Sequence, residues 1–147
     1  MISPSHSILI VEDSDEDYYA TERALKKTGI SNHLYRCHDG EEAVHFLKRT
    51  GPYEASQSSP TPNIILLDLN LPKKDGKEVL AIIKNDNDLK HIPVVVLTTS
   101  IDDRDIRACY QAGANSYIQK PVDSDRFFEA IKRLKDYWFE IVVLPKE

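Results

Sequence analysis

The chain has 147 residues, a formal net charge of −5 and 29% charged side chains. This length fits one domain with a sizeable core, and the negative charge argues against nucleic acid or an anionic membrane surface as the main partner. Cys37 and Cys109 lack the spacing of a metal site and indicate reduced thiols in an intracellular protein. No apolar run approaches the ~18 residues that span a bilayer, so we expect a cytoplasmic protein.

Short apolar runs alternate with helical patterns along the chain. We predict strands at 7–11, 34–37, 64–67, 94–98 and 116–119. We predict helices from 14 or 15 to 28, from 39 to 51, from 76 to between 85 and 88, from 102 to 112, and from 124 through 138. Tyr19 and Tyr110 are expected to face inward, and Ser124 is expected to cap the last helix.

The central strand, 64–67, has no alternation of polar and apolar residues, which is typical of a strand buried on both faces of a parallel sheet. Strands that alternate with helices favour an α/β fold with right-handed crossovers. We therefore predict a doubly wound, flavodoxin-like sheet of five parallel strands in the order 2-1-3-4-5, covered by five helices. The Ser- and Pro-rich segment 53–62 is expected to form a loop.

Polar residues follow four of the predicted strands, namely Glu12 and Asp13, then Asp68, Thr98 and Lys120. In this strand order these ends lie together beside the switch point of the sheet. Three carboxylates within about 4 Å of one another would repel by roughly 4 kcal/mol per pair, so they need a cation, and an open all-oxygen site suits Mg²⁺. Taken singly, each residue could instead be a helix cap, a strand-end hydroxyl or a surface lysine.

A carboxylate beside Mg²⁺, a hydroxyl and an ammonium group suits phosphoryl transfer. Asp68 would be the nucleophile and form an aspartyl phosphate. Lys120 and the metal ion would neutralise charge on the transferring group, and Thr98 would donate a hydrogen bond to the attached phosphoryl group.

These residues lie in the motifs VEDSDED, LLDLNLPKKDG, VVVLTTS and AGANSYIQKP, and with them the chain resembles the receiver domain of two-component response regulators. The resemblance spans about residues 7–134. It implies Asp68 as the phospho-acceptor, a metal site made by Asp13, Glu12, Asp68 and the backbone carbonyl of Asn70, Thr98 as the switch hydroxyl and Lys120 as the phosphate-binding lysine. It also implies Tyr117 as the switch aromatic and a cis peptide bond before Pro121.

Segment 53–62 and the ending DYWFEIVVLPKE look most like the stand-alone receivers that serve cyanobacterial phytochrome histidine kinases. The resemblance therefore implies a sensor histidine kinase, here a phytochrome, as partner. It implies a switch and not an enzyme, apart from catalysis of its own phosphorylation and slow dephosphorylation. Receivers usually have a smaller residue where Thr99 stands, which leaves the lifetime of the phosphate open.

The sequence leaves two other functions open. A small haloacid-dehalogenase-like phosphatase also uses an aspartyl phosphate and Mg²⁺, but it needs an acid two residues after the nucleophile, where this chain has Asn70. A flavodoxin-like electron carrier would need hydroxyl and glycine donors after the first strand, where Glu12 and Asp13 would repel a phosphate.

We divide the chain into an N-terminal arm (1–6), a receiver domain (7–136) and a C-terminal apolar tail (137–147), with no output domain. Output must then be protein contact. The tail carries apolar residues that the core does not obviously need, and such patches mark interaction sites, so we predict a homodimer through the final helix and the tail. The tail could instead fold back on its own domain or dock on the kinase.

Overall fold

The computed structural model describes residues 6–54, 60–121 and 123–145. Most of the N-terminal arm, half of the segment 53–62 and the end of the tail therefore lie outside the described residues. The strands are β1 (Ser7–Val11), β2 (His33–Cys37), β3 (Ile64–Leu67), β4 (Val94–Thr98) and β5 (Ser116–Gln119). The α-helices are α1 (Asp15–Lys27), α2 (Gly40–Lys48), α3 (Gly76–Asn85), α4 (Asp103–Gln111) and α5 (Ser124–Lys135).

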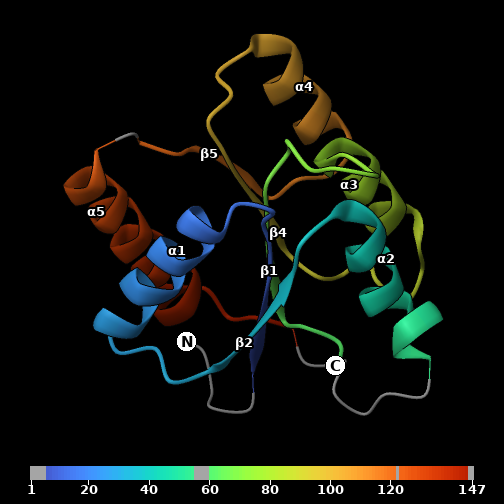
Figure 1. Ribbon diagram of the computed structural model, residues 1–147, viewed down its shortest axis with the longest axis horizontal. Helices are drawn as coiled ribbons and strands as arrows, with labels where there is room; N and C mark the ends of the chain where they lie inside the picture. Colours follow the sequence, from blue (N-terminus) through green and yellow to red (C-terminus); the bar gives the residue numbers. More distant parts are fainter. Residues whose placement is uncertain (1–5, 55–59, 122, 146–147) are drawn as a thin grey trace.

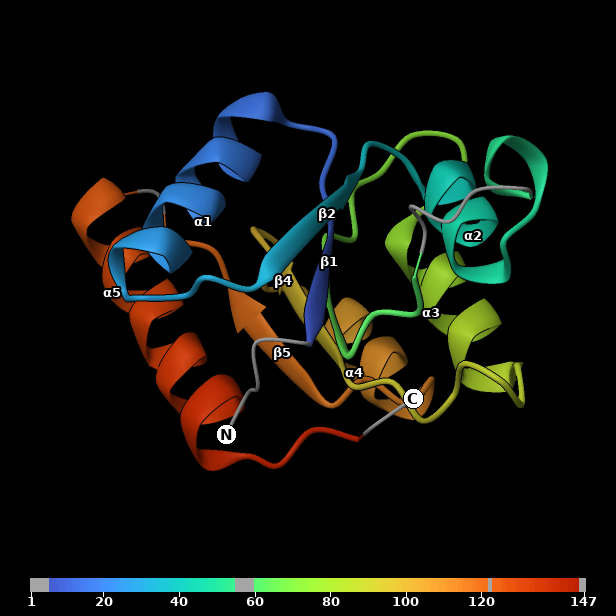
Figure 2. The same ribbon diagram turned by 90° about the horizontal axis from the view of Figure 1, so that it is seen from below.

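The five strands form one parallel sheet in the order β2-β1-β3-β4-β5, which confirms the predicted fold class. The helices α1 and α5 lie together on one face, and α2, α3 and α4 cover the other, as Figures 1 and 2 show from two directions. Every residue of β1, β3 and β4 is buried, whereas β2 and β5 are partly exposed at the edges. Burial on both faces explains the uniformly apolar central strands.

The register of the sheet places the ends of the strands side by side. Val11 at the end of β1 pairs with Leu67 at the end of β3, and Thr98 at the end of β4 pairs with Gln119 at the end of β5. The residues that follow these pairs therefore meet at one edge of the sheet. No helix of the described residues is long and apolar enough to cross a membrane.

Side chains cap the helices at this edge. Ser14 caps α1 by accepting a hydrogen bond from the backbone N–H of Asp17 at 3.2 Å. The cap of α5 is Asp123, which accepts from two backbone N–H groups, so the prediction that Ser124 caps this helix is wrong by one residue. An Asp carboxylate and a Ser hydroxyl are equally good caps, so composition does not choose between neighbours.

Two predictions about buried helix faces are wrong. Tyr18 is buried in α1 and Tyr19 is 52% exposed, while in α4 the buried residue is Cys109 and Tyr110 is 50% exposed. In each helix the tyrosine that is expected to face inward lies next to the residue that is buried. A weak apolar pattern does not fix the rotation of a helix about its axis, because the rotation is set by the surface on which the helix packs.

The C-terminal tail packs on its own domain. After α5 the chain continues as a π-helical segment, Asp136–Ile141, and Trp138, Phe139 and Leu144 are all buried in the cluster that also holds Ile131. A polar contact also holds the tail, because the Asn63 side chain donates to the carbonyl of Pro145 at 3.3 Å. Asn63 is itself fixed to β1, since it accepts from the backbone N–H of Ser7 at 2.8 Å. Part of the predicted apolar patch is thus covered within one chain, whereas Ile141 and Val143 stay exposed.

Candidate phosphoryl-transfer site

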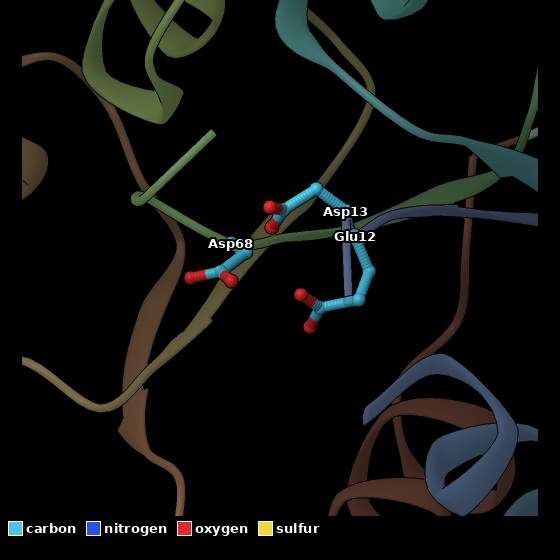
Figure 3. A group of neighbouring side chains, drawn as sticks. All are labelled: Glu12, Asp13 and Asp68. Carbon is cyan, nitrogen blue, oxygen red and sulfur yellow. The ribbon is translucent and has the colours of Figure 1, made fainter. Parts of the chain in front are cut away.

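Three carboxylates converge at the carboxyl edge of the sheet. Oxygens of Glu12, Asp13 and Asp68 all lie within 4.8 Å of one another, and Figure 3 shows the three side chains gathered where β1 and β3 end. Glu12 and Asp68 are buried, whereas Asp13 is exposed. The group is therefore open to solvent on one side only. All of its donors are oxygens, and hard cations such as Mg²⁺ prefer oxygen ligands, so these residues fit a divalent cation.

Lys120 lies beside two of these carboxylates. Its ammonium group forms a short ion pair with Glu12, lies 3.3 Å from an oxygen of Asp68, and contacts Asp17 at 3.0 Å. The backbone N–H of Lys120 donates to the carbonyl of Thr98 at 2.7 Å, which fixes the residue to the end of β4. Only 6% of Lys120 is exposed. A buried ammonium with three carboxylate partners is an anion-binding group and not a solvated surface lysine.

The buried charges shift one another's pKa values. Burial raises the pKa of Glu12, although the hydrogen bond and the charge of Lys120 oppose this shift. Burial alone would lower the pKa of Lys120, but the negative charges of Asp68 and Glu12 outweigh it, so the net pKa is raised. Lys120 therefore keeps its positive charge at neutral pH.

The loop after Asp68 is built tightly against it. The backbone N–H of Asn70 donates to one oxygen of Asp68 at 3.4 Å. The first residue of α3, Gly76, donates its N–H to the carbonyl of Leu69 at 2.8 Å, and a Cβ at this position would lie 2.3 Å from the carbonyl of Asp68. Only glycine allows α3 to begin this close to the backbone of the strand. The predicted metal-ligand loop is thus held in place next to the carboxylates.

Thr98 and Tyr117 meet at Ser100. The fully buried Thr98 accepts a hydrogen bond at its Oγ1 from the Ser100 backbone N–H at 3.4 Å, and the hydroxyl of the half-buried Tyr117 donates to the Ser100 carbonyl at 2.9 Å. Ser100 also donates its side-chain hydroxyl to Asp105 in α4 at 2.7 Å. The two predicted switch residues are therefore linked through the loop between β4 and α4.

Two residues around the site have roles that the sequence reasoning did not assign. Asp17 is an acid in the first turn of α1, a position that favours acids in any helix, yet it also contacts Lys120. Arg36, in a strand to which no chemistry was assigned, donates to the backbone of Glu12. The contact of Asp17 with a residue 103 positions away has no local signal in the sequence. Thr99 is exposed and lines the opening above Lys120.

The expected cis peptide bond before Pro121 is absent. None of the peptide bonds in the described part of the chain is cis, and the bond between Lys120 and Pro121 belongs to that part. The two isomers of a bond before proline differ by only about 0.5–1 kcal/mol, so the sequence Lys-Pro does not select one of them. The prediction of a cis bond is therefore corrected.

Comparison with known proteins identifies the family. The model of the response regulator receiver domain matches residues 8–132. The chain belongs to the response regulator receiver domain family. It is 46% identical over 143 residues to the response regulator Rcp1 of Synechocystis sp., a match that covers 97% of this chain and 95% of that protein.

Solved receiver structures have the same fold over nearly the whole chain. The crystal structure of the Mn²⁺-bound form of Rcp1 has a TM-score of 0.90 at 46% identity, with 96% of this chain and 99% of that one covered. The phosphorylated cyanobacterial phytochrome response regulator RcpA has a TM-score of 0.90 at 40% identity, with 97% and 99% covered. This receiver is therefore a two-component signalling protein similar to phytochrome response regulators, and the phosphatase alternative finds no support.

Proposed function

We propose that Asp68 accepts a phosphoryl group from the phosphohistidine of a sensor histidine kinase. The observation that carries this proposal is the position of Asp68 at the end of β3, with one oxygen facing the Lys120 ammonium and the other facing the Asn70 backbone N–H. The side chain is held in one orientation beside a buried cation. Positioning and charge neutralisation are the main requirements of phosphoryl transfer.

In the proposed reaction a carboxylate oxygen of Asp68 attacks the phosphorus. A new O–P bond forms, and the P–N bond to the kinase histidine breaks with its electron pair remaining on the imidazole nitrogen. Lys120 supplies positive charge and N–H donors to the phosphoryl oxygens, which are more negative than the carboxylate that they join. A bound Mg²⁺ ion, held by Glu12, Asp13, Asp68 and the backbone carbonyl of Asn70, would add positive charge next to the phosphoryl group.

The proposed switch runs from Thr98 to Tyr117. A phosphoryl group brings about −1.5 to −2 charge and new acceptors, so the Thr98 hydroxyl would turn toward it. That movement would withdraw Thr98 from Ser100, the residue whose carbonyl accepts from Tyr117. The consequence would be a changed surface over α4, β5 and α5, which a partner protein reads. The chain would thus act as a switch that promotes its own phosphorylation and not as an enzyme with external turnover.

The proposed partner is a phytochrome histidine kinase, and the proposed location is the cytoplasm. Support for the phytochrome comes from the similarity to the cyanobacterial phytochrome response regulator RcpA. The net negative charge of the chain, −5, supports protein contact, and not nucleic acid, as the output.

We also propose a homodimer through the tail and the final helix. Fewer apolar residues are available for this interface than the sequence suggests, because Trp138, Phe139 and Leu144 are buried within the chain. Tyr137, Ile141 and Val143 remain exposed, by 55%, 70% and 85% respectively, and they would form the contact. Sedimentation of wild type and Ile141→Asp, with and without phosphorylation, tests it: a wild-type protein that is monomeric in both states contradicts the dimer.

Intact mass tests the proposed function. Wild-type protein incubated with Mg²⁺ and acetyl phosphate should gain the mass of one phosphoryl group, and Asp68→Asn should gain none. Asp125→Asn is the matched control, because Asp125 is an exposed acid in the first turn of α5, and it should be labelled like wild type. Labelling of Asp68→Asn to the wild-type extent would show that Asp68 is not the acceptor.

A further inference from the structure

Arg36 contacts the acidic loop from the edge strand β2. Its Nε and Nη2 atoms donate to the backbone carbonyl of Glu12 at 3.1 and 3.0 Å, and its Nη1 lies 2.8 Å from a carboxylate oxygen of Asp15. The Arg36 side chain is only 10% exposed, whereas that of Asp15 is 75% exposed. An exposed ion pair contributes little. The two hydrogen bonds to the Glu12 carbonyl are therefore the important contacts of this side chain.

The peptide groups on both sides of Glu12 are held by β2. The N–H of Glu12 donates to the carbonyl of Cys37 at 3.0 Å, and its carbonyl accepts from Arg36. The carbonyl belongs to the planar peptide group that joins Glu12 to Asp13. Fixing this plane limits the directions in which both neighbouring carboxylates can point. These are the residues that meet Asp68 in the carboxylate group.

We infer that Arg36 is a positioning residue for the divalent-cation site, an inference that rests on the site proposed above. The guanidinium is itself held in place, because its Cζ lies 4.5 Å from the centre of the Tyr18 ring, and Tyr18 is buried in α1. The Nε–H and Nη2–H groups of one rigid guanidinium converge on the single carbonyl oxygen of Glu12, an arrangement that the ammonium of lysine cannot reproduce.

A positioning role and a purely electrostatic role of Arg36 predict opposite changes in Mg²⁺ affinity. Arg36 is a cation close to a site that would bind a cation, so its charge alone weakens the binding of Mg²⁺. If charge were its only effect, replacing Arg36 by a neutral residue would strengthen Mg²⁺ binding. If Arg36 orients the loop, the same replacement weakens it. The sign of the change therefore separates the two effects.

The experiment is a calorimetric titration of Mg²⁺ into full-length Arg36→Gln and Arg36→Lys at a temperature where both are folded. The substitution by Gln removes both the positive charge and the two guanidinium donors. The substitution by Lys keeps the charge but removes the two donors. Both variants should bind Mg²⁺ about tenfold more weakly than wild type, the lower end of the range for groups that orient metal ligands. Wild-type affinity in Arg36→Lys, or wild-type or tighter affinity in Arg36→Gln, overturns the inference.

Two controls separate positioning from general effects. Arg133→Gln removes a positive charge from α5, where the side chain is 81% exposed, and should leave Mg²⁺ affinity unchanged. Leu25→Ala removes a fully buried side chain of α1, so it should lower thermal stability but not the Mg²⁺ affinity of the folded protein. A fall in affinity for Leu25→Ala equal to that for Arg36→Lys would mean that loss of stability explains both, and would also overturn the inference. Failure of wild type to bind Mg²⁺ would instead refute the proposed site.

Discussion

The burial of Phe139 predicts that the tail is part of the folded domain. Phe139 has no exposed surface and packs in the same cluster as Val95 and Ile131. Replacing a buried Phe by Ala removes apolar contacts and leaves a cavity, at a cost of about 3–5 kcal/mol. A domain of this size has roughly 5–15 kcal/mol of stability in total. We therefore expect Phe139→Ala to lose a large part of the free energy of unfolding.

The measurement is urea unfolding followed by circular dichroism. Val143→Ala is the matched control, because Val143 is 85% exposed in the same segment, and its effect should stay within about 0.5 kcal/mol. If the burial occurs within one chain, the loss for Phe139→Ala should not depend on protein concentration. A loss no larger than that for Val143→Ala, or a loss that appears only at concentrations where a dimer forms, would show that Phe139 is not buried within its own chain.

The same burial predicts that removal of the tail destabilises the domain. Removal of the chain after Lys135 takes away Trp138, Phe139 and Leu144, which are all buried. At about 1.5–3 kcal/mol for each side chain, the loss is roughly 5–9 kcal/mol, similar to the total stability. The truncated chain should therefore be largely unfolded. Because an unfolded truncation says nothing about the oligomeric state, point substitutions at exposed tail residues are the better test of a dimer.

Three further predictions concern the site. Asp13→Asn should weaken Mg²⁺ binding strongly, since it removes the exposed carboxylate of the group, and an unchanged NMR titration would count against the site. Thr98→Ala should still be labelled by acetyl phosphate, but phosphorylation of this variant should not change its binding to a partner. A change in partner binding as large as in wild type would exclude the Thr98 hydroxyl as the relay to Tyr117. Without Mg²⁺, Lys120→Met should lower the free energy of unfolding by about 3–5 kcal/mol, because the buried carboxylates lose their cation. Added Mg²⁺ should restore part of this loss. A wild-type free energy of urea unfolding for this variant without Mg²⁺ would contradict the prediction.

The sequence predicted the strands, and the meeting of the polar residues that follow them, because both depend on local patterns. The apolar runs that end at Val11, Leu67 and Thr98 form strands in the expected order, and the register brings the residues after them to one edge. Glu12, Asp13 and Asp68 therefore meet as predicted. A polar residue that directly follows a fully buried parallel strand lies at the carboxyl edge of the sheet, so its position can be predicted from the sequence.

The parts that the sequence did not predict depend on packing between distant segments. Tyr18 and Tyr19 are adjacent and chemically equal, so only the surface under α1 decides which is buried. The apolar tail gave no indication whether its own domain or a second chain would cover it, since both bury the same side chains. The contact of Arg36 with Glu12 joins an edge strand to a loop 24 positions away, and no periodic pattern reports it.

Chemical mapping of the labelled protein identifies the phosphorylated residue directly. An aspartyl phosphate is an acyl phosphate, so borohydride reduction of the labelled protein should convert the phosphorylated Asp to homoserine. Peptide mass spectrometry after incubation with Mg²⁺ and acetyl phosphate should then find homoserine at position 68, and no conversion of Asp13 or Asp17, the other aspartates near Lys120 or Asp68. Homoserine at either of these two positions, with Asp68 unmodified, would show that Asp68 is not the phospho-acceptor.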